Sequence, residues 1–170
     1  QEGYDLTGRA FNLADKYRTP VIILGDGMLG QTMEPVRIMN KKQRLTAYNL
    51  QLKTKPWALT GCAGRKANVV KSFYLAEGAL EKFNLKLQKK YKDIQDKEQR
   101  WEGLYLDDAK VILVAYGSMA RIAKAALNTL RARGKKIGLI RPTTLWPFPK
   151  QAFTRPKNKY LVIEMSYGQM

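Results

Sequence analysis

The last third of the sequence alternates short apolar runs with one helical pattern, which leaves few possible folds. Val111–Ala115 is a run of five apolar residues, as in a buried strand, and Ile137–Ile140 and Tyr160–Glu164 predict two further strands. Ala120–Leu130 carries apolar residues at helical spacing, including alanines that let a helix approach a sheet closely. Because parallel strands need crossover connections, which are right-handed, this order predicts a parallel α/β sheet with the helix on one face.

Two small residues flank the predicted helix. Gly134 follows it, at the position where a left-handed cap favours glycine. Ser118 precedes it, at the carboxyl end of the first strand, where open α/β sheets bind ligands. Ser118 could donate a hydrogen bond to a phosphate there, but we favour the more common role of such a serine, the helix N-cap.

The segment Arg141–Pro149 contains three prolines, which restrict its conformations, and two large aromatic residues. It is either a rigid loop that packs on the chain's own core or a docking surface for another domain or subunit. The candidate interface residues are Arg141, Trp146 and Phe148. We expect Trp146 and Phe148 to lie against protein and not against a small ligand.

The start of the chain predicts a second α/β lobe. Helical spacing of apolar residues predicts a helix over about residues 6–18, and Val21–Leu24 then predicts a buried strand. A strand that is apolar on both faces belongs in the middle of a sheet. Since no neighbouring strand is predicted nearby, we expect Val21–Leu24 to lie in a separate lobe and not in the sheet of the last third.

The motif Gly25-x-Gly27-x-x-Gly30 after this strand has the spacing of a dinucleotide-binding fingerprint. Pro35 is incompatible with the long helix that such a fingerprint needs, and residues 35–76 contain no acidic residue that could bind a ribose. We therefore interpret the motif as a tight glycine-rich loop and not as the site of a nicotinamide dehydrogenase.

The middle of the sequence is strongly basic. Residues 31–76 show little periodicity and indicate an extended segment with at most one short strand, whereas Glu77–Trp101 predicts an amphipathic helix exposed on most of its circumference. The net charge is −1 over residues 1–30, +10 over residues 31–100 and +8 over residues 101–170. A lysine-rich solvated surface is the favoured interpretation. A basic nucleic-acid-binding α/β module is the alternative, although we find no nucleic-acid-binding signature.

Composition excludes several chemistries. The chain has no histidine, so it cannot by itself build a His-ligated zinc site or a Ser-His-Asp triad. Its single cysteine, Cys62, excludes an internal disulfide and an iron–sulfur cluster held by this chain alone, and suits a reducing cytoplasm. No apolar run approaches the roughly 20 residues that span a bilayer. A membrane association is therefore not expected.

Five segments in this order resemble one protein family: Val21–Gln31, Arg65–Ser72, Leu113–Ser118, Arg141–Pro149 and Glu164–Gln169. They are similar to the alpha subunits of thiamine-diphosphate-dependent 2-oxoacid:ferredoxin oxidoreductases, most of all to the branched-chain (2-oxoisovalerate) type. The resemblance implies that residues 1–36 form the end of a pyrimidine-binding domain. It also implies that residues 37–102 form a basic connector that includes the amphipathic helix, and that residues 103–170 form a truncated, transketolase C-terminal-like parallel α/β domain. Most of the pyrimidine-binding domain would be missing from the chain.

The resemblance also implies an activity: oxidative decarboxylation of a 2-oxoacid to its acyl-coenzyme A, with ferredoxin as electron acceptor. The pyruvate and 2-oxoglutarate types are the alternatives within the family. Thiamine diphosphate and Mg²⁺ would be bound in the intact complex with a beta subunit, and iron–sulfur clusters would lie on partner chains, including a ferredoxin-like subunit. We expect none of these cofactors to be held by this chain alone, and the isolated chain to be inactive.

No catalytic or metal-binding residue is assigned. By their position at the carboxyl end of a predicted strand, the nearest candidates for contact with the cofactor are Asp26, Gly27, Leu29 and Gly30.

Overall fold

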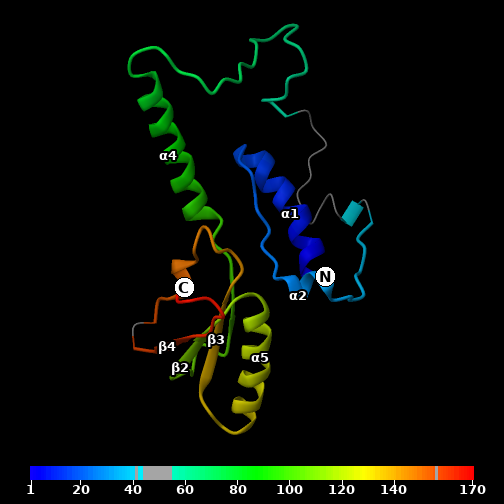
Figure 1. Cartoon of the computed structure of the whole chain (residues 1–170), viewed down its shortest axis with the longest axis vertical. Helices are drawn as coiled ribbons and strands as arrows, with labels where there is room; N and C mark the ends of the chain where they lie inside the picture. Colours follow the sequence, from blue (N-terminus) through cyan, green and yellow to red (C-terminus); the bar gives the residue numbers. More distant parts are fainter. Residues whose placement is uncertain (41, 44–54, 156) are drawn as a thin grey trace. The chain divides into compact units, whose positions relative to one another are not determined.

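Figure 1 shows a computed structural model of the chain, which describes residues 1–40, 42–43, 55–155 and 157–170. The chain divides into two compact units, the first formed by residues 1–24 and 32–86 and the second by residues 25–31 and 87–170. The helices and strands are α1 (Glu2–Tyr17), α2 (Gly27–Gln31), α4 (Ala79–Lys97), β1 (Trp101–Leu104), β2 (Val111–Val114), α5 (Gly117–Ala132), β3 (Ile137–Pro142), the 3₁₀ helix η1 (Lys150–Ala152) and β4 (Lys159–Val162).

The second unit contains a four-stranded sheet in the order β1-β3-β2-β4 (Figure 1). β2 is central and pairs in parallel with both β3 and β4, with Val111 beside Ile137 on one side and Lys159 on the other. The predicted parallel sheet is therefore confirmed, and α5 covers one of its faces as expected.

The two faces of the sheet are both buried, which explains why its strands are apolar without alternation. Leu113 and Leu139 on one face pack against the small side chains of α5 and against Leu127, which is fully buried. Ile112 and Ile140 on the other face pack against η1 and the residues that flank it.

The antiparallel strand β1 was not predicted. Its residue Trp101 was expected to end the amphipathic helix, but α4 ends at Lys97 and is otherwise as expected, with Ile94 as its one buried residue. The residues after α4 bond to β3 instead: Glu102 lies opposite Arg141, and the Arg100 N–H donates to the Thr144 hydroxyl at 3.0 Å. Backbone hydrogen bonds to the free edge of β3 therefore favour a strand at these residues, although the spacing of the apolar residues favours a helix.

The carboxyl end of α5 is closed as the sequence predicted. Gly134 has a φ of +73°, the left-handed conformation that favours glycine. Its N–H donates to the Arg131 carbonyl at 2.9 Å, and the Lys135 N–H donates to the Leu130 carbonyl at 3.0 Å. This pair of bonds is the Schellman cap, which satisfies two carbonyl groups of the last helical turn.

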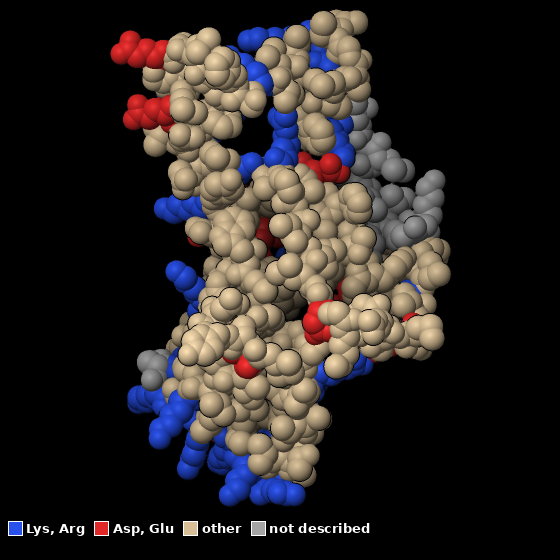
Figure 2. Space-filling model, viewed as in Figure 1, with Lys and Arg blue, Asp and Glu red and all other residues tan. Residues whose placement is uncertain are grey.

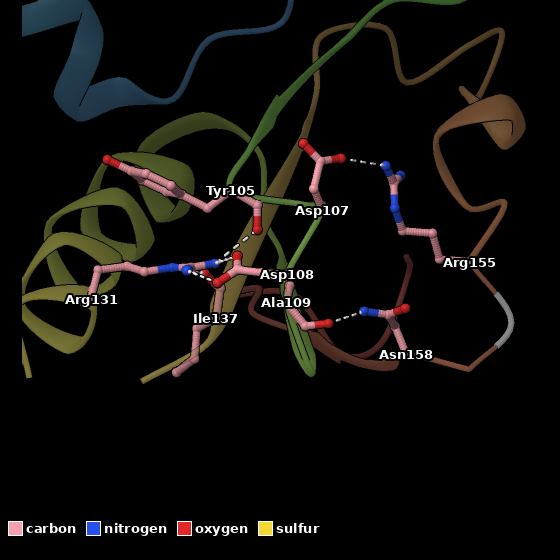
Figure 3. Close-up of polar contacts among 8 residues, drawn as sticks. All are labelled: Tyr105, Asp107, Asp108, Ala109, Arg131, Ile137, Arg155 and Asn158. Carbon is pink, nitrogen blue, oxygen red and sulfur yellow. Dashed lines mark hydrogen bonds and ion pairs between the residues drawn. The ribbon is translucent and has the colours of Figure 1, made fainter. Parts of the chain in front are cut away.

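The side chain of Arg131 connects three segments at the amino end of the sheet (Figure 3). Arg131, near the end of α5, donates to the Asp108 carboxylate at 2.8 Å, to the Tyr105 carbonyl at 2.9 Å and to the Ile137 carbonyl at 2.6 Å. Its guanidinium also lies 4.8 Å from the centre of the Tyr105 ring. The helix, the loop before β2 and the start of β3 are thus joined by a single side chain.

The first unit contains α1, which starts earlier than the predicted helix at 6–18. The prediction of a strand at Val21–Leu24 was wrong: these residues form no strand and pair with none of the strands in the described residues. A strand requires a neighbour for its N–H and C=O groups, and the described part of the first unit offers none. The described residues of 31–76 also contain no strand. Residue 41 and residues 44–54 of the predicted connector lie outside the described residues.

Within the described part of the chain, every helix is too short or too polar to cross a membrane.

Candidate functional site

The topology points to the carboxyl ends of β2 and β4. The chain leaves β2, passes through α5 and enters β3, which lies on one side of β2. After β3 the chain crosses back over β2 and enters β4, which lies on the other side of β2. The strand order therefore reverses direction at β2. Open α/β sheets bind ligands at such a switch point, between the loops that follow the two strands.

Asp26 lies at this edge, although it is far in sequence from the sheet. One carboxylate oxygen accepts a hydrogen bond from the Leu29 N–H at 2.7 Å, and the Asp26 carbonyl accepts from the Gly30 N–H at 3.1 Å. Asp26 is thus the N-cap of the short helix α2. Its other carboxylate oxygen accepts a hydrogen bond from the Ser118 hydroxyl at the start of α5, and the Ser118 N–H also donates to this carboxylate.

Ser118 is therefore not the N-cap that the sequence predicted. The N-cap of α5 is Tyr116, which makes no capping bond with its side chain, and Ser118 belongs to the first turn. The capping oxygen comes instead from the carboxylate of Asp26. The hydrogen bond from the Ser118 hydroxyl is the main reason that the pKa of Asp26 is lowered, and the bond from the Leu29 N–H adds to it.

The structure places the predicted cofactor-contact residues Asp26, Gly27, Leu29 and Gly30 in the second unit, beside the start of α5. Asp26 and Leu29 are joined by the capping bond. A Cβ atom added at Gly27 or Gly30 would have no other atom of the described residues within 4 Å, so packing among these residues does not require glycine at either position.

A second carboxylate lies in the loop after β4. Glu164 accepts hydrogen bonds from the Ser166 hydroxyl at 2.6 Å and the Gln169 N–H at 3.2 Å, and the first of these bonds is the main cause of its lowered pKa. Sequence reasoning did not single out Glu164 as a site residue, because its partners are local and follow no recognised motif.

These two carboxylates limit the chemistry of the edge. Since the pKa values of Asp26 and Glu164 are both lowered, each side chain is ionised at neutral pH and is a weak proton acceptor. The edge therefore suits hydrogen-bond donors and cations better than a phosphate. Among the described residues, no group of three or more Cys, Asp or Glu side chains is arranged to hold a metal ion.

The three interface candidates have different surroundings. Arg141 donates to the Glu102 carboxylate at 3.0 Å across β1 and β3, and Phe148 stacks on Phe153 at 5.4 Å, so both contribute to the chain's own fold. Trp146 contacts the Tyr91 ring of α4 edge-on at 5.9 Å and lines an open groove there, but 55% of its surface is exposed.

We predict that replacing Asp26 with asparagine loosens the segment of residues 25–31. Asparagine keeps the capping oxygen for Leu29 but loses the charge that strengthens the bond from Ser118. Hydrogen exchange of the backbone amides of α2 should accelerate several-fold. Because the pKa of Asp26 is lowered in the folded state, this stabilisation is present at neutral pH and is lost as the pH falls through that lowered pKa.

Ser118→Ala is the matched partner variant. If the two side chains act through one bond, Asp26→Asn and Ser118→Ala should have similar effects, and the double variant should add little to either. Additive effects of the two substitutions would show that the bond does not hold the segment.

Comparison with known proteins agrees with this architecture. Residues 1–91 match the family model described as "Pyruvate flavodoxin/ferredoxin oxidoreductase, thiamine diP-bdg", and residues 109–170 match "Pyruvate:ferredoxin oxidoreductase core domain II". The chain is similar in fold to a solved 2-oxoglutarate:ferredoxin oxidoreductase from Magnetococcus marinus, with a TM-score of 0.52 and 21% identity over 89% of this chain and 35% of that one.

Curated proteins provide the higher sequence identities. The whole chain is 44% identical to ketoisovalerate oxidoreductase subunit VorB of Methanothermobacter marburgensis, of which it covers 47%. It is 30% identical, again over its whole length, to 2-oxoglutarate synthase subunit KorA of Methanocaldococcus jannaschii, of which it covers 51%. The chain thus spans about half the length of the curated relatives that it matches.

Proposed function

Because the chain belongs to the pyruvate flavodoxin/ferredoxin oxidoreductase family, we propose that it forms part of a subunit that acts in the oxidative decarboxylation of 2-oxoacids. The product would be the acyl-coenzyme A, and ferredoxin would accept the electrons. The observation that carries this proposal is the match of the family model to residues 1–91 together with relatives that align over the entire chain.

We further propose a branched-chain 2-oxoacid, ketoisovalerate, as the substrate. The identity of 44% to a ketoisovalerate oxidoreductase subunit exceeds the 30% to a 2-oxoglutarate synthase subunit, and both alignments cover the whole chain. The difference supports the branched-chain type over the 2-oxoglutarate type.

The edge that contains Asp26 does not fit the diphosphate end of thiamine diphosphate. A Mg²⁺-bound diphosphate needs carboxylate ligands for the metal and cationic or N–H donors for the phosphates, whereas the Asp26 carboxylate already occupies the start of α5 and would repel a phosphate. We therefore propose that a partner beta subunit holds the diphosphate and Mg²⁺. Iron–sulfur clusters would also lie on partner chains, one of them ferredoxin-like, because this chain has one cysteine. That single thiol fits a cytoplasmic complex.

We propose that this chain has a structural role, and not a chemical one, at the edge of the sheet that contains Asp26 and Glu164. Asp26 orients residues 25–31 on the start of α5, and Glu164 orders the loop after β4, so two loops at the carboxyl ends are fixed relative to the sheet. Neither carboxylate is proposed to transfer a proton.

The proposed activity can be tested on the complex that contains this chain. A tagged chain would be purified from its host with the proteins that accompany it, and reduction of a viologen dye would be measured with coenzyme A and each of three substrates: ketoisovalerate, 2-oxoglutarate and pyruvate. Ketoisovalerate should give the highest kcat/KM. A complex without any 2-oxoacid-dependent dye reduction would refute the proposed function, and a preference for another substrate would refute the branched-chain assignment.

The isolated chain provides a second test. Calorimetry with thiamine diphosphate and Mg²⁺ should show no measurable binding, because the edge that contains Asp26 does not fit the diphosphate and we propose that the partner subunit holds it. Stoichiometric binding would mean that the chain holds a complete cofactor site.

We also infer that the exposed side of Trp146 contacts a partner subunit, since a large exposed aromatic ring on a proline-restricted loop loses little conformational freedom on binding. Trp146→Ala should weaken assembly by about 2 kcal/mol or more, roughly 30-fold in Kd. Tyr167→Ala, which removes another exposed aromatic ring, is the control and should leave assembly unchanged. Unchanged assembly of the Trp146 variant would leave only the rigid-loop interpretation.

A further inference from the structure

The amino ends of the three parallel strands bring lysines together in a row. The Lys110 N–H donates to the Lys136 carbonyl at 2.9 Å, and the Lys159 N–H donates to the Lys110 carbonyl at 3.3 Å. The three residues therefore lie at the starts of β2, β3 and β4: Lys110 and Lys136 directly precede the paired residues Val111 and Ile137, and Lys159 lies beside Val111. All three are exposed.

Further cations extend the row along the two turns that lead into β3 and β4. We define the basic rim as six exposed residues: Lys110, Arg133, Lys135, Lys136, Lys157 and Lys159. Figure 2 shows Lys and Arg side chains gathered over the lower end of the second unit, with little acidic surface among them.

The acidic side chains nearest to the rim are already paired (Figure 3). Asp108 binds Arg131 at 2.8 Å, and Asp107 binds Arg155 at 3.4 Å. The charge of Lys136 also lowers the pKa of Asp108, but the hydrogen bond from Arg131 is the larger cause. Within the described ranges, none of the six rim cations forms an ion pair.

The like charges of Lys110 and Lys136, which are level on neighbouring strands about 5 Å apart, raise the free energy of the fold. For Arg133 and Lys135 the carbonyl end of α5 offers some compensation. Among the described residues, Lys110 and Lys159 form no ion pair, and Lys136 acts on Asp108 only through its charge; what the sheet uses at these positions is their backbone groups. A negatively charged surface across the rim would turn this repulsion into attraction.

We propose that the basic rim is a docking surface for an acidic protein surface. The rim lies at the amino ends of the strands, the opposite edge from Asp26 and Glu164, so this inference does not depend on the proposed function. Its side chains favour a protein over a nucleic acid, because the two nearby rings already have partners in the chain: Arg131 lies over one face of the Tyr105 ring, and Tyr160 packs against Phe153. Charges spread over adjacent strands match a broad acidic face.

The test compares two triple substitutions that remove equal charge from the full chain. Lys110→Gln, Lys136→Gln and Lys159→Gln neutralise the rim, and Lys82→Gln, Lys86→Gln and Lys89→Gln neutralise three exposed lysines of α4. Far-ultraviolet circular dichroism would confirm that both variants are folded. Binding of poly-L-glutamate and of a short DNA duplex would be measured by fluorescence anisotropy over a range of salt concentrations.

If the rim is the docking surface, the rim variant should bind poly-L-glutamate roughly tenfold more weakly at low salt, and its affinity should depend less on salt. The α4 variant should stay within about twofold of the unmodified chain. Equal losses in both variants, or no binding by the unmodified chain, would overturn the proposal. Rim-dependent binding of DNA that is tighter than binding of poly-L-glutamate would overturn it in favour of a nucleic-acid partner.

Discussion

Replacing Leu127 with alanine is expected to lower the free energy of unfolding of the second unit by about 2–5 kcal/mol. Leu127 is fully buried between α5 and the sheet, where it packs in one cluster with Leu113 and Leu139. Alanine would remove its apolar contacts and leave a cavity that the paired strands β2 and β3 can close only in part. Hydrogen exchange of the β2 and β3 amides in increasing urea measures this loss in the second unit alone.

The same helix provides the control. Ile122 lies on the outer face of α5 with 60% of its surface exposed, so Ile122→Ala should change the stability by no more than about 0.5 kcal/mol. If the two variants lost similar stability, α5 would not be packed on the sheet through the face that contains Leu127.

The part of the fold that could be predicted from the sequence is the part whose signals are local. The apolar runs at Val111–Ala115 and Ile137–Ile140 need burial on both faces, and the alanine stripe between them allows a helix to provide it for one face. Gly134 could be recognised as a cap because the left-handed turn after a helix favours glycine. In each case the sequence pattern and the strand, helix or cap that it predicts involve the same residues, without a partner that is distant in sequence.

The predictions that failed depend on partners distant in sequence. Val21–Leu24 has the composition of a strand, but a strand forms only where a neighbour accepts its backbone bonds. Trp101 continues a helical pattern, yet its strand pairs with β3, about 40 residues further along the chain. In the structure the residues of β1 alternate between exposed and half-buried, but the sequence Trp-Glu-Gly-Leu is too short to predict a strand by itself.

The sequence led to Asp26 through a strand at Val21–Leu24 that does not form, and the contact of Asp26 with a cofactor stays a prediction. Asp26 lies instead beside the start of α5, after β2. The bond from Ser118 to Asp26 joins residues 92 positions apart, and no spacing rule connects them. The role of Ser118 was therefore misassigned to the nearest helix end, where a serine most often acts.

Arg131→Lys is expected to lower the melting temperature of the second unit by several degrees, although it preserves the charge. The guanidinium of Arg131 donates to Asp108 and to the carbonyls of Tyr105 and Ile137 at the same time. The single ammonium group of lysine cannot reach three acceptors in these directions, so two backbone carbonyls would lose their side-chain donor. Thermal unfolding followed by circular dichroism, with hydrogen exchange of the β3 amides, measures the effect.

Arg133→Lys is the matched control, because Arg133 is exposed and lies only two residues further along the chain. It should leave the melting temperature unchanged. The pKa of Asp108 is lowered chiefly by its hydrogen bond from Arg131, so the stability from this pair is present at neutral pH and is lost as the pH falls through the lowered pKa. In acid the difference between the unmodified chain and Arg131→Lys should therefore shrink, but it should not vanish, since the two bonds to carbonyl groups do not titrate. A difference that disappeared completely in acid would mean that the charge pair alone, and not the three-way connection, stabilises the amino end of the sheet.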